Sequence, residues 1–128
     1  MVVLRAAQAT ETPDAPAIGL DVFTPMAEVW GLTTDEQIRL LGSPPRSTFF
    51  KWKKEGGTLP RDTSERISHF CAIWKALQIL FTDTDQSDGW LRRPNGAFGG
   101  QSALDRMLSG HFYDLVLVRQ YLDAQRGG

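Results

Sequence analysis

Apolar residues recur at three- and four-residue spacing along most of the chain, and no stretch alternates strictly between apolar and polar positions. Such spacing places apolar side chains on one face of an α-helix, whereas alternation would indicate a β-strand. The clearest case is a wide apolar arc formed by Ile67, Phe70, Cys71, Trp74, Leu77 and Phe81. An arc this wide predicts a long helix covered from two sides, at the centre of an all-α fold.

The chain before the first predicted helix has a different composition. Residues 1–20 are rich in Ala, Thr and Pro and contain almost no large side chains to bury, which predicts a disordered arm. Thr24 followed by Pro25 then indicates a helix start, because proline at the first helical position lacks only an N–H that would stay unpaired. We expect this first helix to reach about Trp30.

A helix, a short turn and another helix are predicted next. Thr33 and Glu36 form a capping box, so a helix should begin there and end near Gly42. Ser43 is expected to cap a third helix, residues 44–54, whose first turn tolerates two prolines. Two glycines follow and would close that helix.

Four further segments complete the predicted fold. The long helix should open at Asp62, and a short helix should span about residues 85–91. A glycine-rich loop is expected over residues 93–100, followed by a helix over about 102–109 that Ser102 caps. The last helix should cover about residues 111–124. The long helix would tie the N-terminal and C-terminal units together.

The predicted third helix carries a basic face opposite an apolar one. At ~100° per residue, Phe49 and Trp52 point inward. The outer face and its flanks hold the candidate DNA-contacting residues Arg46, Ser47, Lys51, Lys53 and Lys54. The second helix of a helix-turn-helix enters the major groove, where its N-terminal residues reach base edges and lysines reach phosphates. A merely solvated helix face is the alternative that this charge pattern leaves open, and Phe50 lies between the two faces.

The last predicted helix is apolar nearly all round. One stripe would face the domain's own core and consists of Leu115, Val118 and Leu122. A second stripe, on roughly the other side, consists of Tyr113, Leu117 and Tyr121. A helix of this kind needs two partners, and an exposed apolar patch typically marks an interaction surface. The alternative is a helix wholly wrapped in a tight bundle.

Composition narrows the classes of function. The 128 residues fit one compact domain or two small helical units that share a core. Because the net charge is only -1, nucleic-acid binding would have to come from a local patch. Cys71 is the single cysteine, which excludes an internal disulfide and fits a reducing compartment, so we expect a cytoplasmic protein. No apolar run approaches a membrane span, no secretory signal is present, and no membrane partner is expected.

Signals of catalysis are weak. His69 and His111 lie far apart in sequence, and no Ser/His/Asp order or metal-ligand spacing stands out. His111 and Asp114, one turn apart, are typical of a local surface pair. The glycine-rich loop lacks the preceding strand and the spacing of a phosphate loop. We therefore expect no enzyme activity, no catalytic residue, no metal and no cofactor.

The order of features in the C-terminal part resembles the toxin-binding domain of Xre/MbcA/ParS antitoxins. The family pattern is a Trp-Leu pair, a Pro-Asn pair, a Gly-Gly turn, a helix with two leucines, and a Val/Leu-rich helix ending near a glycine. The matching positions are Trp90 and Leu91, Pro94 and Asn95, Gly99 and Gly100, Leu104 and Leu108, then 116–122 and Gly127. Upstream, SPPRSTFFKWKKEG is similar to the family's Xre-like helix-turn-helix. Ser102 and Ala103 depart from the Thr-Pro pair that family members often carry.

The resemblance covers residues 22–128 and implies an architecture and a partner. An Xre-like helix-turn-helix bundle, residues 21–61, would be joined by the long helix to a small helical toxin-binding domain, residues 62–128. The partner would be a RES-domain toxin, which consumes NAD or transfers its ADP-ribosyl group, and the complex would bind operator DNA. The toxin-binding residues would be Trp90, Asn95, Tyr113, Leu117, Arg119, Tyr121, Arg126, Gly127 and Gly128.

The sequence pattern is also compatible with two other classes of function. A helix-turn-helix regulator without a toxin would use the basic helix for DNA, and its final helix would form a homodimer seam. A small enzyme is the more distant alternative. A RES-type reading frame beside the gene would favour the antitoxin over the regulator.

Overall fold

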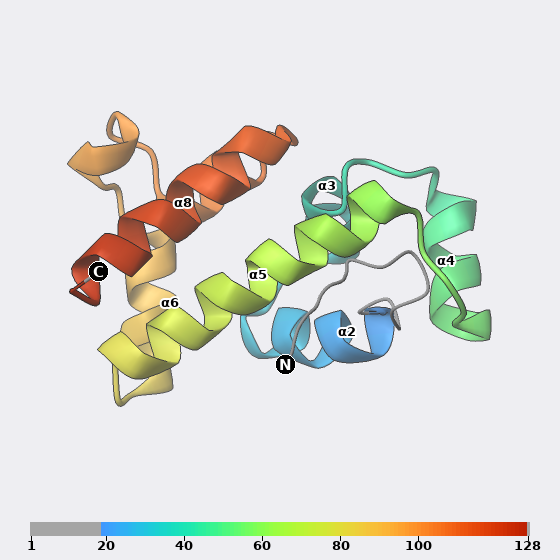
Figure 1. Ribbon diagram of the computed structural model, residues 1–128, viewed down its shortest axis with the longest axis horizontal. Helices are drawn as coiled ribbons and strands as arrows, with labels where there is room; N and C mark the ends of the chain where they lie inside the picture. Colours follow the sequence, from blue (N-terminus) through green and yellow to red (C-terminus); the bar gives the residue numbers. More distant parts are fainter. Residues whose placement is uncertain (1–18, 128) are drawn as a thin grey trace, which may run out of the picture.

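The computed structural model describes residues 19–127, so the predicted arm lies almost wholly outside the described part. Within that part every regular element is helical, which confirms the all-α prediction, and a single isolated bridge pairs Pro94 with Ser102. The elements, drawn in Figure 1, are α2 (Leu20–Val29), α3 (Thr34–Leu40), α4 (Arg46–Glu55), α5 (Arg61–Leu80), α6 (Thr84–Arg92), the 3-10 turn η1 (Gly96–Phe98), α7 (Ala103–Met107) and α8 (Phe112–Gln125).

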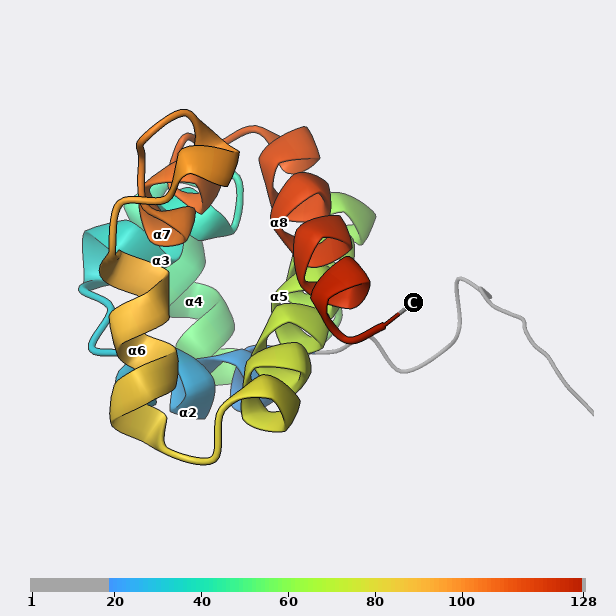
Figure 2. The same cartoon turned by 90° about the vertical axis from the view of Figure 1, so that its left-hand side faces the viewer.

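The long helix α5 joins the two units, as its apolar arc predicted. It packs on α2 on one side and on α8 on another (Figures 1 and 2). Phe70 is buried at the first contact, where its ring centroid lies 4.9 Å from that of Phe23 and 4.8 Å from that of Trp30. Leu115 and Val118 of α8 are buried as expected. The N-terminal and C-terminal units therefore share one core.

The predicted start of the first helix is wrong. α2 begins at Leu20, and Pro25 lies inside it rather than at its first position. Leu20 and Phe23 are both buried, so packing of these side chains outweighs the hydrogen bond that a proline inside a helix removes. The predicted arm also included Leu20, which belongs to the first helix instead.

The helix-turn-helix is confirmed, with one error at its turn. Thr33 and Glu36 make both hydrogen bonds of the capping box that opens α3. Ser43 does not cap α4: it has a left-handed φ of 60°, and the N-cap is Pro45. The cause is steric, since a residue that precedes proline is pushed out of the helical region, and Pro44 stands before Pro45.

Elements of the C-terminal unit follow the sequence signals closely. The Asp83 side chain caps α6, and the Ser102 hydroxyl accepts a hydrogen bond from the Asp105 N–H at the start of α7. α5 begins one residue before Asp62, whose carboxylate instead accepts a hydrogen bond from Arg66. Side-chain acceptors thus define the starts of both short helices.

Three arginines make contacts between the N-terminal and C-terminal units. Arg39 of α3 donates to the carbonyl oxygen of Leu108 at 3.2 Å, and Arg92 of α6 donates to the carbonyl oxygen of Trp30. Arg66, which is buried, lies 5.6 Å from the centre of the Phe112 ring of α8. None of these pairings has a sequence signature, because the partners are distant along the chain.

The turn before α4 depends on a glycine that approaches α5. Gly42 has φ +93°, and a Cβ there would lie 3.0 Å from Nε of Arg66. We expect Gly42→Ala to lower the free energy of unfolding by about 1–2 kcal/mol for the backbone strain and further for displacing Arg66. Gly57→Ala is the matched control, since Gly57 has φ +92° with no atom within 4 Å. If urea denaturation shows the same decrease in the free energy of unfolding for both variants, the contact with Arg66 is unimportant.

Candidate functional site

The basic helix α4 forms one end of the molecule, away from α6 and from the C-terminal end of α8 (Figure 1). Phe49 is buried on its inner side, and Trp52 packs against the core. Ser47, Lys51 and Lys54 are all exposed on the opposite side. We call these three residues the outer face of α4. The structure therefore places them together on one surface of the second helix of the helix-turn-helix.

Arg46 has a partner that sequence reasoning missed. Its guanidinium lies 2.6 Å from a carboxylate oxygen of Asp35 in the first turn of α3, and both side chains are exposed. An exposed pair of this kind contributes little to stability, and it lowers the positive charge available at the start of α4. No local spacing indicates a pair eleven residues apart, although the tight turn between α3 and α4 makes it possible.

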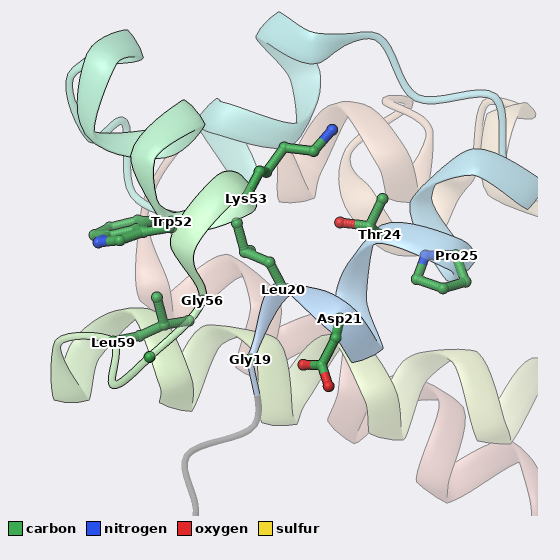
Figure 3. Close-up of a pocket in the computed structure, with 10 residues that line it drawn as sticks. Gly19, Leu20, Asp21, Thr24, Pro25, Trp52, Lys53, Gly56 and Leu59 are labelled. Carbon is green, nitrogen blue, oxygen red and sulfur yellow. The ribbon is translucent and has the colours of Figure 1, made fainter.

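Lys53 points to a different side of α4 from Lys51 and Lys54. It lines a hollow between α2 and α4 together with Leu20, Asp21 and Thr24 (Figure 3). Its ammonium nitrogen lies 5.6 Å from the centre of the Phe49 ring. Of the three lysines predicted to contact DNA, Lys53 is thus the one that lies away from the outer face.

The C-terminal unit gathers three aromatic side chains into one cluster. Trp90 of α6 and Tyr121 of α8 stack with centroids 6.2 Å apart, and Phe98 of η1 lies 5.3 Å from Tyr121. Trp90 and Tyr121 are half-buried, while Phe98 is buried. Two residues predicted separately to bind toxin are therefore neighbours, and Phe98 is a third member that the sequence did not single out.

The second apolar stripe of α8 is only partly free. Tyr113 is 64% exposed, but Leu117 and Tyr121 pack against the core from its edge. The sequence stripe therefore does not form one continuous exposed face, because α6 and η1 cover its C-terminal part. Tyr113 is the member of the stripe that remains available to a partner.

The remaining residues predicted to bind toxin lie in the loop and at the C-terminal end of α8. The Asn95 side chain accepts a hydrogen bond from the Ala97 N–H and so fixes the turn that leads into η1. Asp123 stands between two arginines, with one carboxylate oxygen 3.9 Å from Arg119 and the other 3.9 Å from Arg126. Gly127, with φ +93°, closes α8, whereas Gly128 lies outside the described residues.

Arg119 also reaches across to α5. Its guanidinium lies 3.1 Å from Nδ1 of His69, so a donated hydrogen bond requires that nitrogen to be unprotonated. Burial of the ring and then the positive charge of Arg119 lower the pKa of His69, while the carboxylate of Glu65 opposes the shift. His69 is therefore held in its neutral form between the two helices.

This lowered pKa predicts a pH-dependent stability. The unfolded chain takes up a proton more readily than the folded one, so stability is complete above the unfolded pKa of about 6.5 and decreases as pH falls below it. We expect the free energy of unfolding to decrease less from roughly pH 7 to pH 5 in His69→Asn than in the natural chain. His111→Asn is the control, since that ring is exposed. An unchanged slope in His69→Asn would contradict the assignment.

Side chains that could take part in catalysis instead form hydrogen bonds within the C-terminal unit. Asp114 is buried and accepts hydrogen bonds from Arg106 at 2.8 Å and from the Ser109 hydroxyl, with the His111 ring 3.5 Å away. Burial opposes ionisation of this carboxyl, but the Ser109 and Arg106 hydrogen bonds and nearby positive charge lower its pKa overall. Because the serine donates to Asp114 rather than to the histidine, these residues do not form the relay that activates a nucleophile.

The next features to consider are the Cys71 thiol, possible metal ligands and possible membrane-spanning helices. Burial raises the pKa of the Cys71 thiol, which is opposite to the shift that a reactive cysteine needs. Within residues 19–127, His, Cys, Asp and Glu side chains form no cluster of three or more that could hold a metal ion. No helix in this range has both the length and the apolar character needed to cross a membrane.

Both units match domains of a known protein family. Residues 9–70 match the antitoxin Xre-like helix-turn-helix domain, and residues 76–128 match the antitoxin Xre/MbcA/ParS C-terminal toxin-binding domain. The chain belongs to the Xre/MbcA/ParS antitoxin family. The two matches divide inside α5, which agrees with a long helix shared by the two units of this antitoxin.

A curated relative is similar to this chain over most of its length. The antitoxin is 63% identical over 109 residues to a Sinorhizobium fredii (strain NBRC 101917 / NGR234) protein named "Uncharacterized protein y4oB". The aligned part covers 85% of this chain and 84% of that protein. The helix-turn-helix match also begins at residue 9, earlier than residue 22, where the resemblance in the sequence begins.

Proposed function

We propose that this antitoxin binds and neutralises a RES-domain toxin with its C-terminal unit and binds operator DNA with α4. The observation that carries the proposal is the match of residues 76–128 to a toxin-binding domain. In this domain α8 presents Tyr113 to solvent in its first turn, and Tyr121, eight residues further along, forms the aromatic cluster with Trp90 and Phe98. Aromatic side chains of this kind commonly dominate the binding energy of protein interfaces. The RES identity of the toxin rests on the family resemblance.

The arrangement of the two surfaces supports both activities in one molecule. α4 lies at one end of the molecule, and α6 with the C-terminal end of α8 lies at the other (Figure 1). A toxin seated along α8, from Tyr113 in its first turn to its C-terminal end, would leave α4 accessible. DNA binding by the complex is the arrangement that autorepression of an operon requires.

Co-purification tests the toxin assignment. Tagged full-length antitoxin should retain the RES-type product of a neighbouring reading frame when the two are expressed together. The full chain is needed because a fragment beginning at Asp62 would expose Phe70, which packs against α2 in the intact protein. Recovery of the antitoxin without the RES-type protein would reject the assignment.

We further propose that the end of α8 blocks the toxin's NAD site. Arg126 lies at the C-terminal end of α8 and would present charge and donors where the phosphates of NAD bind. Arg126→Ala should still form the complex, with affinity reduced by at most about tenfold, but should allow measurable NAD turnover by the bound toxin. Arg93→Ala, another exposed arginine, is the control and should keep turnover at background. Full inhibition by Arg126→Ala would contradict blocking by this residue.

A further inference from the structure

Phe50 is a large apolar side chain on α4 that neither the core nor phosphate binding requires. It is 44% exposed, although the adjacent Phe49 is buried. The other exposed large apolar side chains of the described residues lie on α2, α5 and α8, so Phe50 is alone on the basic helix. Exposure of a phenyl ring in water is unfavourable, and its placement next to the outer face of α4 suggests that a ligand covers it.

The ring is held by its neighbours on the protein side. The Phe49 and Phe50 centroids lie 5.4 Å apart in an edge-to-face arrangement, and the Arg46 guanidinium lies 5.5 Å from the centre of the Phe50 ring. Arg46 is in turn paired with Asp35. A side chain that is positioned in advance loses less conformational entropy when it binds.

The position of Phe50 along α4 places it beside the phosphate-binding residues. It lies three residues after Ser47 and immediately before Lys51, and at ~100° per residue it points between Arg46 and Ser47. In a docked helix-turn-helix the N-terminal half of the second helix reaches base edges, whereas lysines reach phosphates. If Lys51 and Lys54 contact phosphates of the DNA backbone, Phe50 would face the floor of the major groove.

Resting on the proposed binding of DNA by α4, we propose that Phe50 recognises thymine in the operator by apolar contact with the thymine C5 methyl group. Thymine is the base that presents a methyl group in the major groove, and apolar side chains select it there. The charge of α4 selects DNA as the occupant, since three lysines and Arg46 share the helix with a single acid, Glu55. This role would make Phe50 a specificity-determining residue rather than a source of general affinity.

Selection of binding sites from a random-sequence DNA duplex library tests the proposal. The full-length natural chain and Phe50→Ala are each used to select binding sites. Every thymine of the natural chain's site is then replaced singly by deoxyuridine, which lacks only the methyl group. Phe50→Leu, which retains an apolar side chain, is the matched control, and circular dichroism verifies that each variant is folded.

We expect one or two of the deoxyuridine replacements to weaken binding of the natural chain by about fourfold, the equivalent of the ~0.8 kcal/mol of one buried methyl group. Phe50→Ala should bind both duplexes equally and should lose the preference for thymine at that position alone. Phe50→Leu should keep part of the preference.

Four results would overturn the proposal. If Phe50→Ala keeps the same thymine preference, or if no deoxyuridine weakens the natural chain, methyl recognition by Phe50 is wrong while DNA binding by α4 stands. If Phe50→Ala selects the same site but binds toxin or a second copy less tightly, Phe50 belongs to a protein contact. If the natural chain selects no sequence and retains no duplex, the DNA-binding part of the proposed function fails as well.

Discussion

Replacing Lys51 and Lys54 together with glutamate should abolish operator binding by the antitoxin. Both lysines are exposed on the outer face of α4, where two phosphate contacts would be replaced by two repulsive charges. We expect affinity for a duplex from the region upstream of the gene to fall on the order of 100-fold or more, in a gel-shift assay at fixed salt. For any residual binding, the slope of log affinity against log salt should become shallower by about 2.

The matched control for this variant carries the same change in net charge at other sites. Lys75→Glu with Arg93→Glu alters exposed cations of α5 and of the loop after α6, away from α4. That control should shift DNA nearly as well as the natural chain, and Lys51→Glu with Lys54→Glu should still form the toxin complex, because both lysines lie outside residues 76–128. Unchanged retardation by Lys51→Glu with Lys54→Glu would show that these lysines are only a solvated helix face.

Tyr113→Ala should weaken the toxin complex by about 30-fold or more, which corresponds to an interface residue worth at least ~2 kcal/mol. Tyr113 is the most exposed of the large apolar side chains that the structure describes, and it lies on the helix that the toxin-binding match contains. Because the ring packs little within the antitoxin, the free energy of unfolding should change by no more than about 0.5 kcal/mol. Titration calorimetry with purified toxin measures the affinity.

Two further variants are compared with Tyr113→Ala in the same measurement. Val22→Ala removes an exposed apolar side chain from α2, outside residues 76–128, and should leave toxin affinity unchanged. Tyr121→Ala should lower both stability and affinity, because Tyr121 packs on Trp90 and Phe98. If Tyr113→Ala binds toxin as tightly as the natural chain, the interface lies elsewhere on the C-terminal unit.

Local signals in the sequence predicted the helices well where the signal and the packing agree. The capping box at Thr33 and the cap at Ser102 are confirmed, since their hydrogen bonds involve residues three positions away. The signals at Thr24 and Ser43 failed for different reasons. Because Leu20 and Phe23 are buried, α2 begins five residues before Pro25. Two consecutive prolines shift the start of α4 to Arg46.

The candidate surfaces were less predictable than the helices, because they depend on what covers each helix. Helical periodicity placed Ser47, Lys51 and Lys54 on one face, and the structure places them there. It could not reveal that Asp35 pairs with Arg46, or that α6 and η1 cover Tyr121. Residues distant in sequence decide both facts, and a periodic pattern on one helix contains no information about them.

The central claim, that the C-terminal unit neutralises a RES-domain toxin, is tested most directly by NAD turnover. Purified toxin from the neighbouring reading frame is titrated with full-length antitoxin. Turnover should fall to background with the natural chain and with Lys51→Glu plus Lys54→Glu, whereas Tyr113→Ala should need about 30-fold more protein for the same inhibition. Undiminished turnover in the presence of excess natural antitoxin would contradict the account.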